Sequence, residues 1–152
     1  MKLNFFASLF FTSLVLAVGL AHLLSLPNKI VLSNEEYIVA QRAYDNWSLV
    51  SIIILCAIVS TLLQAIRLRG RRDVFVPALI ALICLVIAQV IFWLFTFPAN
   101  QQTHNWTILP VNWIDIRNKW EYSHAAAAIF ELIAFVMVTI SVLNKKSYRS
   151  LH

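Results

Sequence analysis

Two histidines and one glutamate of this 152-residue chain have the types and spacing of a chemical site. Glu121 and His124 form a Glu-x-x-His pair, which places both side chains one helical turn apart on the same face. His22 lies far away in the sequence, near the end of a long apolar run. Imidazole is the commonest proton acceptor in proteins, and two imidazoles with a carboxylate also suit zinc or iron. The sequence therefore predicts His22, Glu121 and His124 as catalytic groups or, alternatively, as ligands of a divalent metal.

The elements that must position these residues are membrane-spanning helices. Hydrophobic residues make up 61% of the chain and charged residues 12%, against about 45–50% and 25% in soluble domains, and the mean hydropathy is +0.77. This composition excludes a soluble domain and a disordered chain. A spanning helix needs about 20 mostly apolar residues, and four stretches qualify, at 4–26, 47–66, 74–97 and 120–143. We expect residues 1–152 to form a single all-α domain, an integral membrane four-helix bundle.

A cleaved signal peptide is the alternative interpretation of the first apolar run. The run is longer than the usual apolar core of such peptides, about 7–15 residues, and no clean Ala-x-Ala cleavage site follows it. We therefore expect the first stretch to remain as a spanning helix.

Basic residues are divided unequally between the two sides of the predicted bundle. The richer side carries Lys2, Arg67, Arg69, Arg71, Arg72, Lys145, Lys146 and Arg149, and the poorer side carries Lys29, Arg42, Arg117 and Lys119. The positive-inside rule then predicts cytoplasmic termini, as in a bacterial inner membrane. The net charge of +5 is explained by topology and requires no nucleic acid. His22 and His124 each lie about four residues inside the outer surface, a depth of roughly 6 Å.

The two outer segments are predicted to extend the second and fourth helices beyond the membrane. Ser33 and Glu36 have capping-box spacing, and no Pro or Gly follows before Gly70, so the second helix is predicted to begin near Asn34. The fourth helix is predicted to begin near Trp113, after an irregular segment. The bundle is therefore expected to carry outer extensions of helices 2 and 4.

The fourth helix carries a stripe of residues unsuited to lipid. Trp113, Arg117, Trp120 and His124 recur at helical spacing, and Glu131 lies two turns further on nearly the same face. Such a stripe must face the bundle interior or a wet cleft. Glu131 is predicted to be neutral and hydrogen-bonded or, alternatively, to relay protons.

Several functional classes lack their signatures. The chain has no phosphate-binding loop, no dinucleotide fingerprint and no basic-aromatic pattern typical of nucleic-acid binding. Cys56 and Cys84 lie near mid-span and form no Cys-x-x-Cys pair, which argues against a thiol oxidoreductase. The four predicted spans are unbroken, which argues against a transporter.

The segment from Asn100 to His124 is the most distinctive part of the chain. It reads Asn100-x-x-Thr103-x-Asn105-Trp106-Thr107-x-x-Pro110-x-x-Trp113-x-x-x-Arg117-x-x-Trp120-Glu121-x-x-His124. Together with Leu26-Pro27-Asn28-Lys29 and with Gln41, Tyr44 and Trp47, it resembles the anthrone oxygenase-like family of small four-helix membrane proteins. Ala127 departs from that pattern, because many members carry arginine there.

The resemblance implies oxidation of an anthrone to an anthraquinone with dioxygen, without a metal or organic cofactor. It implies roles for Trp120 and His124, supported by Asn100 and Arg117. His124 is suited to removing the acidic C–H proton of an anthrone, and the aromatic residues to forming a flat slot for a polycyclic ring. The predicted substrate-binding residues are Trp120, Arg117, Trp113, Trp106, Asn100, Tyr44 and Gln41.

Three hypotheses follow from these features. The first is a membrane oxygenase or oxidoreductase whose partner is a lipophilic aromatic molecule, such as an anthrone or quinol, bound near the outer leaflet. The second is a metal- or cofactor-binding membrane protein that uses His22, Glu121 and His124. The third is a non-catalytic structural or partner subunit, in which the polar stripe serves helix assembly and the aromatic residues form an interfacial belt.

Overall fold

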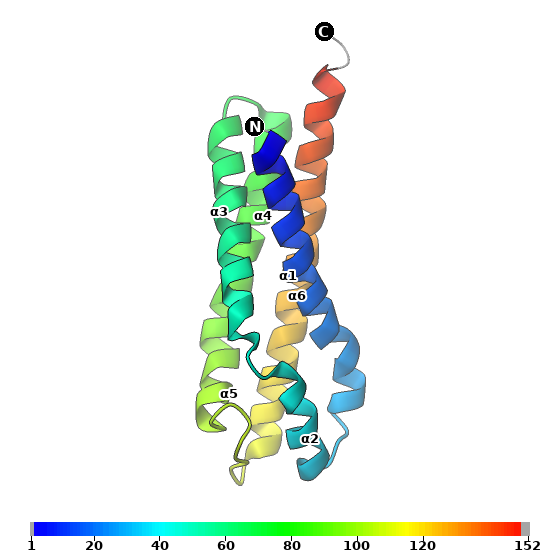
Figure 1. The fold of residues 1–152 in the computed structure, drawn as a ribbon, viewed down its shortest axis with the longest axis vertical. Helices are drawn as coiled ribbons and strands as arrows, with labels where there is room; N and C mark the ends of the chain where they lie inside the picture. Colours follow the sequence, from blue (N-terminus) through cyan, green and yellow to red (C-terminus); the bar gives the residue numbers. More distant parts are fainter. Residues whose placement is uncertain (1, 150–152) are drawn as a thin grey trace.

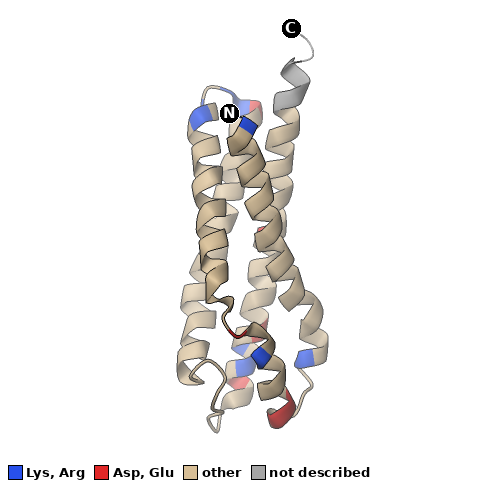
Figure 2. Ribbon diagram, viewed as in Figure 1, with Lys and Arg blue, Asp and Glu red and all other residues tan. Residues whose placement is uncertain are grey.

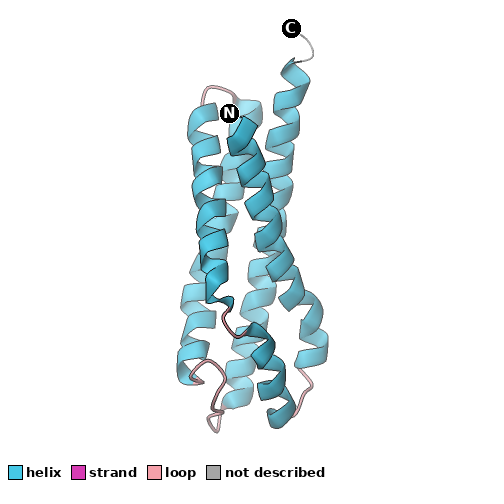
Figure 3. Cartoon of the chain, viewed as in Figure 1, coloured by secondary structure: helices cyan, strands magenta, loops and turns pink. Residues whose placement is uncertain are grey.

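The long apolar stretches of the sequence form four helices that run side by side (Figure 1). The computed structural model describes residues 2–149, and side chains as far as residue 144. Within this range, Lys2–Lys29, Trp47–Leu68, Arg72–Gln102 and Trp113–Asn144 are long and apolar enough to cross a membrane. The four predicted spans and the all-α bundle are confirmed, and the chain is an integral membrane protein. The described residues are helices joined by short loops (Figure 3).

The bundle is antiparallel, and each main helix packs on its neighbours in a ring. Helix α1 (Lys2–Lys29) contacts α3 (Val50–Leu68) and α6 (Trp113–Arg149), and α4 (Arg72–Ile91) contacts the same two helices. Both termini and the α3–α4 loop lie at one end, here called the terminal end (Figure 1). Helices α2 (Asn34–Gln41) and α5 (Phe97–Gln102) lie at the opposite end, here called the α2 end. Charged residues gather mainly at these two ends (Figure 2).

Small and medium-sized apolar residues form the centre of the bundle. Val15, Ala57, Leu85, Ala134 and Val138 belong to one buried cluster. Alanines in such positions let helix backbones approach closely, which compensates for the weak hydrophobic drive between helices in lipid. Large apolar side chains point outward, where a soluble protein would carry polar ones.

A buried hydrogen-bond chain joins all four main helices toward the terminal end. Ser8 on α1 donates to the Gln64 side-chain oxygen on α3. Gln64 donates to the Ser141 hydroxyl on α6 at 2.8 Å, and Ser141 donates to the Val74 carbonyl on α4 at 2.8 Å. Since unpaired polar groups are costly in hydrocarbon, this chain fixes how the helices are rotated against one another.

The predicted outer extension of the second helix exists as a separate element. The capping box is confirmed, because the Ser33 hydroxyl accepts from the Glu36 amide and Glu36 accepts from the Ser33 amide. The prediction of one unbroken helix from Asn34 into the second span is wrong. Helix α2 ends at Gln41, and two short 3₁₀ turns, Arg42–Tyr44 and Trp47–Leu49, precede α3. Asn46 lies between them with a φ of 66°, a conformation that asparagine tolerates better than most residues.

The outer extension of the fourth helix is confirmed as predicted. Helix α6 begins at Trp113 and continues without a break to Arg149. The third span is longer than expected, because a π-helical turn, Phe92–Thr96, connects α4 directly to α5. Pro98 follows that turn, and the change of register accommodates its missing N–H. The side chains of Lys145, Lys146 and Arg149, which contributed to the predicted topology, lie outside the described side chains.

Candidate functional site

His22 and His124 meet face to face between α1 and α6. Their ring centroids are 3.9 Å apart and the rings are inclined by 11°. His22 is buried, at 4% exposure, and His124 is half-buried. Among the described residues, no group forms a hydrogen bond with the buried Nδ1 of His22. Two positive charges at this separation would repel strongly, so the pair is suited to taking up one proton rather than two.

Three aromatic side chains surround the histidine pair. Tyr44, the last residue of the first 3₁₀ turn, stacks on His22 with the ring centroids 4.5 Å apart. Trp47 and Trp120 meet His22 edge-on at 5.5 and 5.2 Å. Trp120 also contacts His124 at 4.3 Å. The break of the second helix at Asn46 brings Tyr44 and Trp47 over the site, which a continuous helix would not have done in the same way.

A buried ion pair lies beside this cluster. The Lys29 ammonium is 2.9 Å from Glu121 Oε2, and the two side chains are 7% and 0% exposed. The ammonium also lies 4.8 Å from the Tyr44 ring centroid and 4.9 Å from that of Trp120, a cation–π geometry. Glu121 thus pairs with Lys29 and holds the ammonium against the aromatic rings.

Tyr37 of α2 completes the surroundings of Glu121. Its hydroxyl donates to Glu121 Oε1 at 2.9 Å, and the residue is fully buried. Burial, and secondarily the neighbouring Glu121 carboxylate, raise the pKa of the Tyr37 phenol well above its usual value. Tyr37 therefore remains protonated and donates a stable hydrogen bond. This contact fastens the capped helix α2 to α6.

Arg117 binds the chain that leads into α2. Its Nη1 donates to the Leu32 carbonyl at 3.0 Å. The guanidinium lies 4.8 Å from the Trp113 ring centroid and 5.7 Å from that of Tyr37. Arg117 is 8% exposed and does not touch the histidine pair in any contact of the described residues. Its place indicates that it positions α2 and the loop before it.

Asn100 and Trp106 hold Trp120 from the other side. The Trp120 indole donates to Asn100 Oδ1 at 2.8 Å, and Trp106 meets Trp120 edge-on at 5.9 Å. Trp106 is 5% exposed and sits at the end of three consecutive residues, 104–106, with positive φ. Such a turn costs about 1–2 kcal/mol per residue. Here the Thr103 hydroxyl, which accepts from the Trp106 amide at 3.1 Å, helps to hold it.

The remaining candidates lie at the margin of the site or away from it. Gln41 is buried at 5% exposure, and its side-chain nitrogen has no hydrogen-bond partner among the described residues. Glu131 lies deeper, with its carboxylate against Gly19 of α1, and one of its oxygens lacks a hydrogen-bond partner among the described residues. Cys56 and Cys84 are free thiols in the spans.

The structure thus brings most predicted residues together but divides them into two adjoining groups. His22, His124, Trp120 and Tyr44 form the aromatic–histidine cluster, whereas Glu121 turns toward Lys29 and Tyr37. In the described part of the chain, no group of three or more His, Cys, Asp or Glu side chains is placed to hold a metal ion.

Sequence reasoning missed two residues of the site, Trp47, which meets His22 edge-on, and Lys29. The sequence predicts Lys29 only as one of the basic residues of the outer side. The useful signal was its position two turns after His22 on the same helix, since residues seven apart share a face. A lysine on the face of a predicted catalytic histidine requires an acidic partner.

Sequence and structural comparisons were made with protein families, curated proteins and solved structures. None of them matches this chain. The resemblance to the anthrone oxygenase-like family therefore stays a prediction, and function has to be argued from the site.

Proposed function

We propose that the aromatic–histidine cluster binds a lipophilic aromatic molecule, such as an anthrone or a quinol, and that the protein oxidises it with dioxygen. The observation that carries the proposal is the stacked His22–His124 pair, enclosed by Tyr44, Trp47 and Trp120. Flat aromatic walls with a few polar groups are typical of sites for such ligands. By the charge asymmetry of the sequence, this α2 end faces outward, near the outer leaflet of a bacterial inner membrane.

The histidine pair serves as the proton acceptor in this proposal. Removal of one methylene proton from an anthrone leaves an electron-rich carbanion, and the imidazole pair holds that proton. The carbanion gives its electrons to dioxygen, so that a carbon–oxygen bond forms. The O–O bond then breaks as the second methylene proton leaves. One oxygen atom becomes the new ketone and the other leaves as water, with no metal or organic cofactor required.

Lys29 supplies the positive charge that favours an anionic intermediate. Its ammonium lies against the Tyr44 and Trp120 rings, where an aromatic anion would be close to it. Many members of the anthrone oxygenase-like family carry an arginine where this chain has Ala127. In this proposal Lys29 supplies the positive charge of that arginine. Glu121 keeps the ammonium buried and oriented at 2.9 Å.

Oxygen uptake by the purified protein in lipid vesicles tests the proposal. A panel of anthrones and quinols is supplied, and binding is followed separately by quenching of tryptophan fluorescence. His124→Gln should lower the rate by about 10²-fold or more, the usual contribution of a general base, while binding is retained. His104→Asn is the matched control, because His104 is exposed in a loop, and it should leave the rate unchanged.

The two other hypotheses predict different results. Stoichiometric metal in the purified protein, lost in the His22→Ala/His124→Ala double variant, would replace cofactor-free oxidation with the metal-binding alternative. Absence of both ligand binding and oxygen uptake, with His124→Gln lowering only thermal stability, would instead support a structural or partner subunit.

A further inference from the structure

A groove runs between α1 and α3 in the terminal half of the bundle, far from the aromatic–histidine cluster. Its volume is about 580 Å³, which is within the usual range of about 300–1,000 Å³ for small-molecule sites. It is open to the surrounding lipid, since Leu3, Leu55 and Val59 in its walls are 79%, 61% and 44% exposed. The lining is completed by Asn4, Ala7, Phe11, Cys56, Ser60, Leu63 and Arg67.

The groove has the length of one leaflet's hydrocarbon layer. Along α3 it extends from Leu55 to Arg67, which is roughly 18 Å at 1.5 Å per residue. Half of a typical hydrocarbon core is about 15 Å. The apolar walls therefore match the depth that a single acyl chain occupies, starting from the terminal end.

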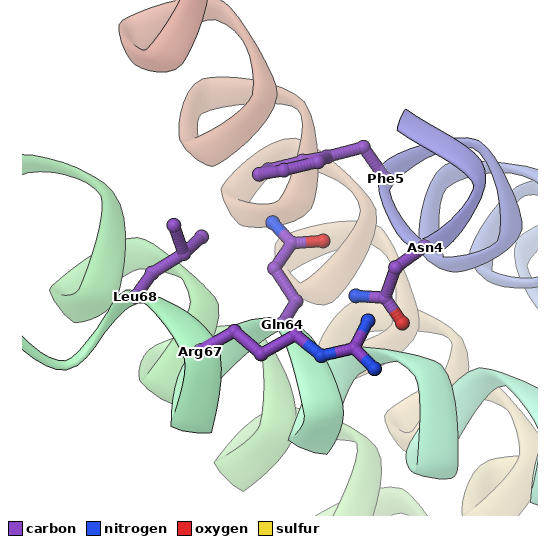
Figure 4. A pocket seen from close by; sticks show the side chains of 5 residues that line it. All are labelled: Asn4, Phe5, Gln64, Arg67 and Leu68. Carbon is purple, nitrogen blue, oxygen red and sulfur yellow. The ribbon is translucent and has the colours of Figure 1, made fainter. Parts of the chain in front are cut away.

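The charged and amide side chains of the lining, Arg67 and Asn4, lie where the groove reaches the terminal end, whereas the Ser60 hydroxyl is bonded to the Cys56 carbonyl of its own helix. Arg67 extends across α3 toward Asn4 of α1 (Figure 4). The Asn4 amide donates to the Ser60 carbonyl at 3.3 Å, which fixes its position at the rim. Asn4 and Arg67 also line a small adjoining pocket, together with Phe5, Gln64 and Leu68 (Figure 4). An arginine and an amide at the headgroup level, above an apolar groove, offer hydrogen-bond donors to a phosphate.

The charge around this rim is positive and mostly uncompensated. Exposed Lys2, Arg67, Arg69 and Arg72 lie at the terminal end. Asp73 is the acidic residue of this end, and it pairs with Arg71 at 2.6 Å. No acidic side chain among the described residues pairs with Arg67. Basic pockets between spanning helices favour anionic headgroups over zwitterionic ones.

We propose that the α1–α3 groove binds one acyl chain of an anionic glycerophospholipid, whose phosphate is held by Arg67 and Asn4. The apolar walls bind the chain, and the rim selects the headgroup. The site is separate from the aromatic–histidine cluster and does not depend on the function proposed for it.

Native mass spectrometry of the full-length protein, exchanged into detergent with equal phosphatidylglycerol and phosphatidylcholine, tests this site. The protein should retain one phosphatidylglycerol in preference to phosphatidylcholine. Arg67→Gln should reduce phosphatidylglycerol affinity by about tenfold, the order expected for a lost charged hydrogen bond. Arg69→Gln removes the same charge at the same end outside the groove and should leave that affinity within about twofold. Ala7→Phe narrows the groove and should weaken retention of both lipids.

Equal effects of Arg67→Gln and Arg69→Gln would overturn the proposal, because they would show only general attraction to a basic surface. The proposal would also be overturned if Arg67→Gln left the retention of phosphatidylglycerol unchanged. A lipid-free dimer that Ala7→Phe disrupts would show that a second copy of the chain occupies the groove. If Ala7→Phe does not fold, the comparison of the two arginine variants still decides the question.

Discussion

Removing the charge of Glu121 should destabilise the protein strongly, because it leaves Lys29 buried without a counter-ion. The two groups are 2.9 Å apart and at most 7% exposed. Breaking such a pair by removing one partner typically costs about 3–5 kcal/mol. In Glu121→Gln the amide oxygen still accepts from the Tyr37 hydroxyl, so the loss reports the ion pair and not that hydrogen bond. The midpoint of thermal unfolding should fall by roughly 10 °C.

The measurement is far-UV circular dichroism during thermal and denaturant unfolding in one detergent. A double-mutant cycle with Lys29→Met separates the pair from its surroundings. We expect the double variant to be more stable than Glu121→Gln alone, because no charge is then left unpaired. Asp45→Asn is the control, since the Arg42–Asp45 pair is 76% and 61% exposed and such pairs contribute at most about 1 kcal/mol. If the unfolding free energy of Glu121→Gln lay within about 0.5 kcal/mol of that of the natural sequence, the stabilising role of the buried ion pair would be refuted.

Two further predictions concern the packing of α1 and the cap of α2. Gly19→Ala should lower unfolding free energy by about 1–3 kcal/mol, because an added Cβ meets the Glu131 carboxylate and lies 3.2 Å from a backbone carbon of α6. Gly70→Ala is the control, because an added Cβ there meets nothing within 4 Å, and it should change the unfolding free energy little. If both variants lowered the thermal unfolding midpoint equally, the close packing of α1 on α6 at Gly19 would be contradicted. Hydrogen bonds from Ser33 lower the pKa of Glu36 in the folded protein. The capping box therefore stabilises the fold fully above about pH 4.3, the pKa of glutamate in the unfolded chain. That stabilisation is lost as the pH falls through the lower pKa of the folded protein. Amide NMR shifts of α2 should follow that titration. Ser33→Ala should make the lowering of the Glu36 pKa smaller, because it removes the hydroxyl and keeps the backbone amide as a donor. A Glu36 titration unaffected by Ser33→Ala would exclude the side-chain part of the capping interaction.

The number of spans and the depth of the site were predictable because both depend on local composition. Each span is an uninterrupted apolar run longer than the membrane requires. Counting residues from the ends of the first and fourth runs placed His22 and His124 at the same depth. The break at Asn46 was not predictable in the same way. No Pro or Gly marks it, and it depends on Tyr37 and Arg117 binding α2 and its preceding loop to α6.

The rotation of each helix about its axis is what decides the composition of the site. Hydropathy says little about it here, because these helices are apolar on nearly every face. Polar side chains set the rotation, since each one must find a partner inside the bundle. Glu121 follows Trp120 directly, one position off the aromatic stripe of the fourth helix, and it is fully buried because Lys29 and Tyr37 meet it there. Toward the terminal end, Ser8, Gln64 and Ser141 likewise find hydrogen-bond partners in one another. With α1 and α6 held at both ends, the rotation that pairs the polar groups is also the one that stacks His22 on His124.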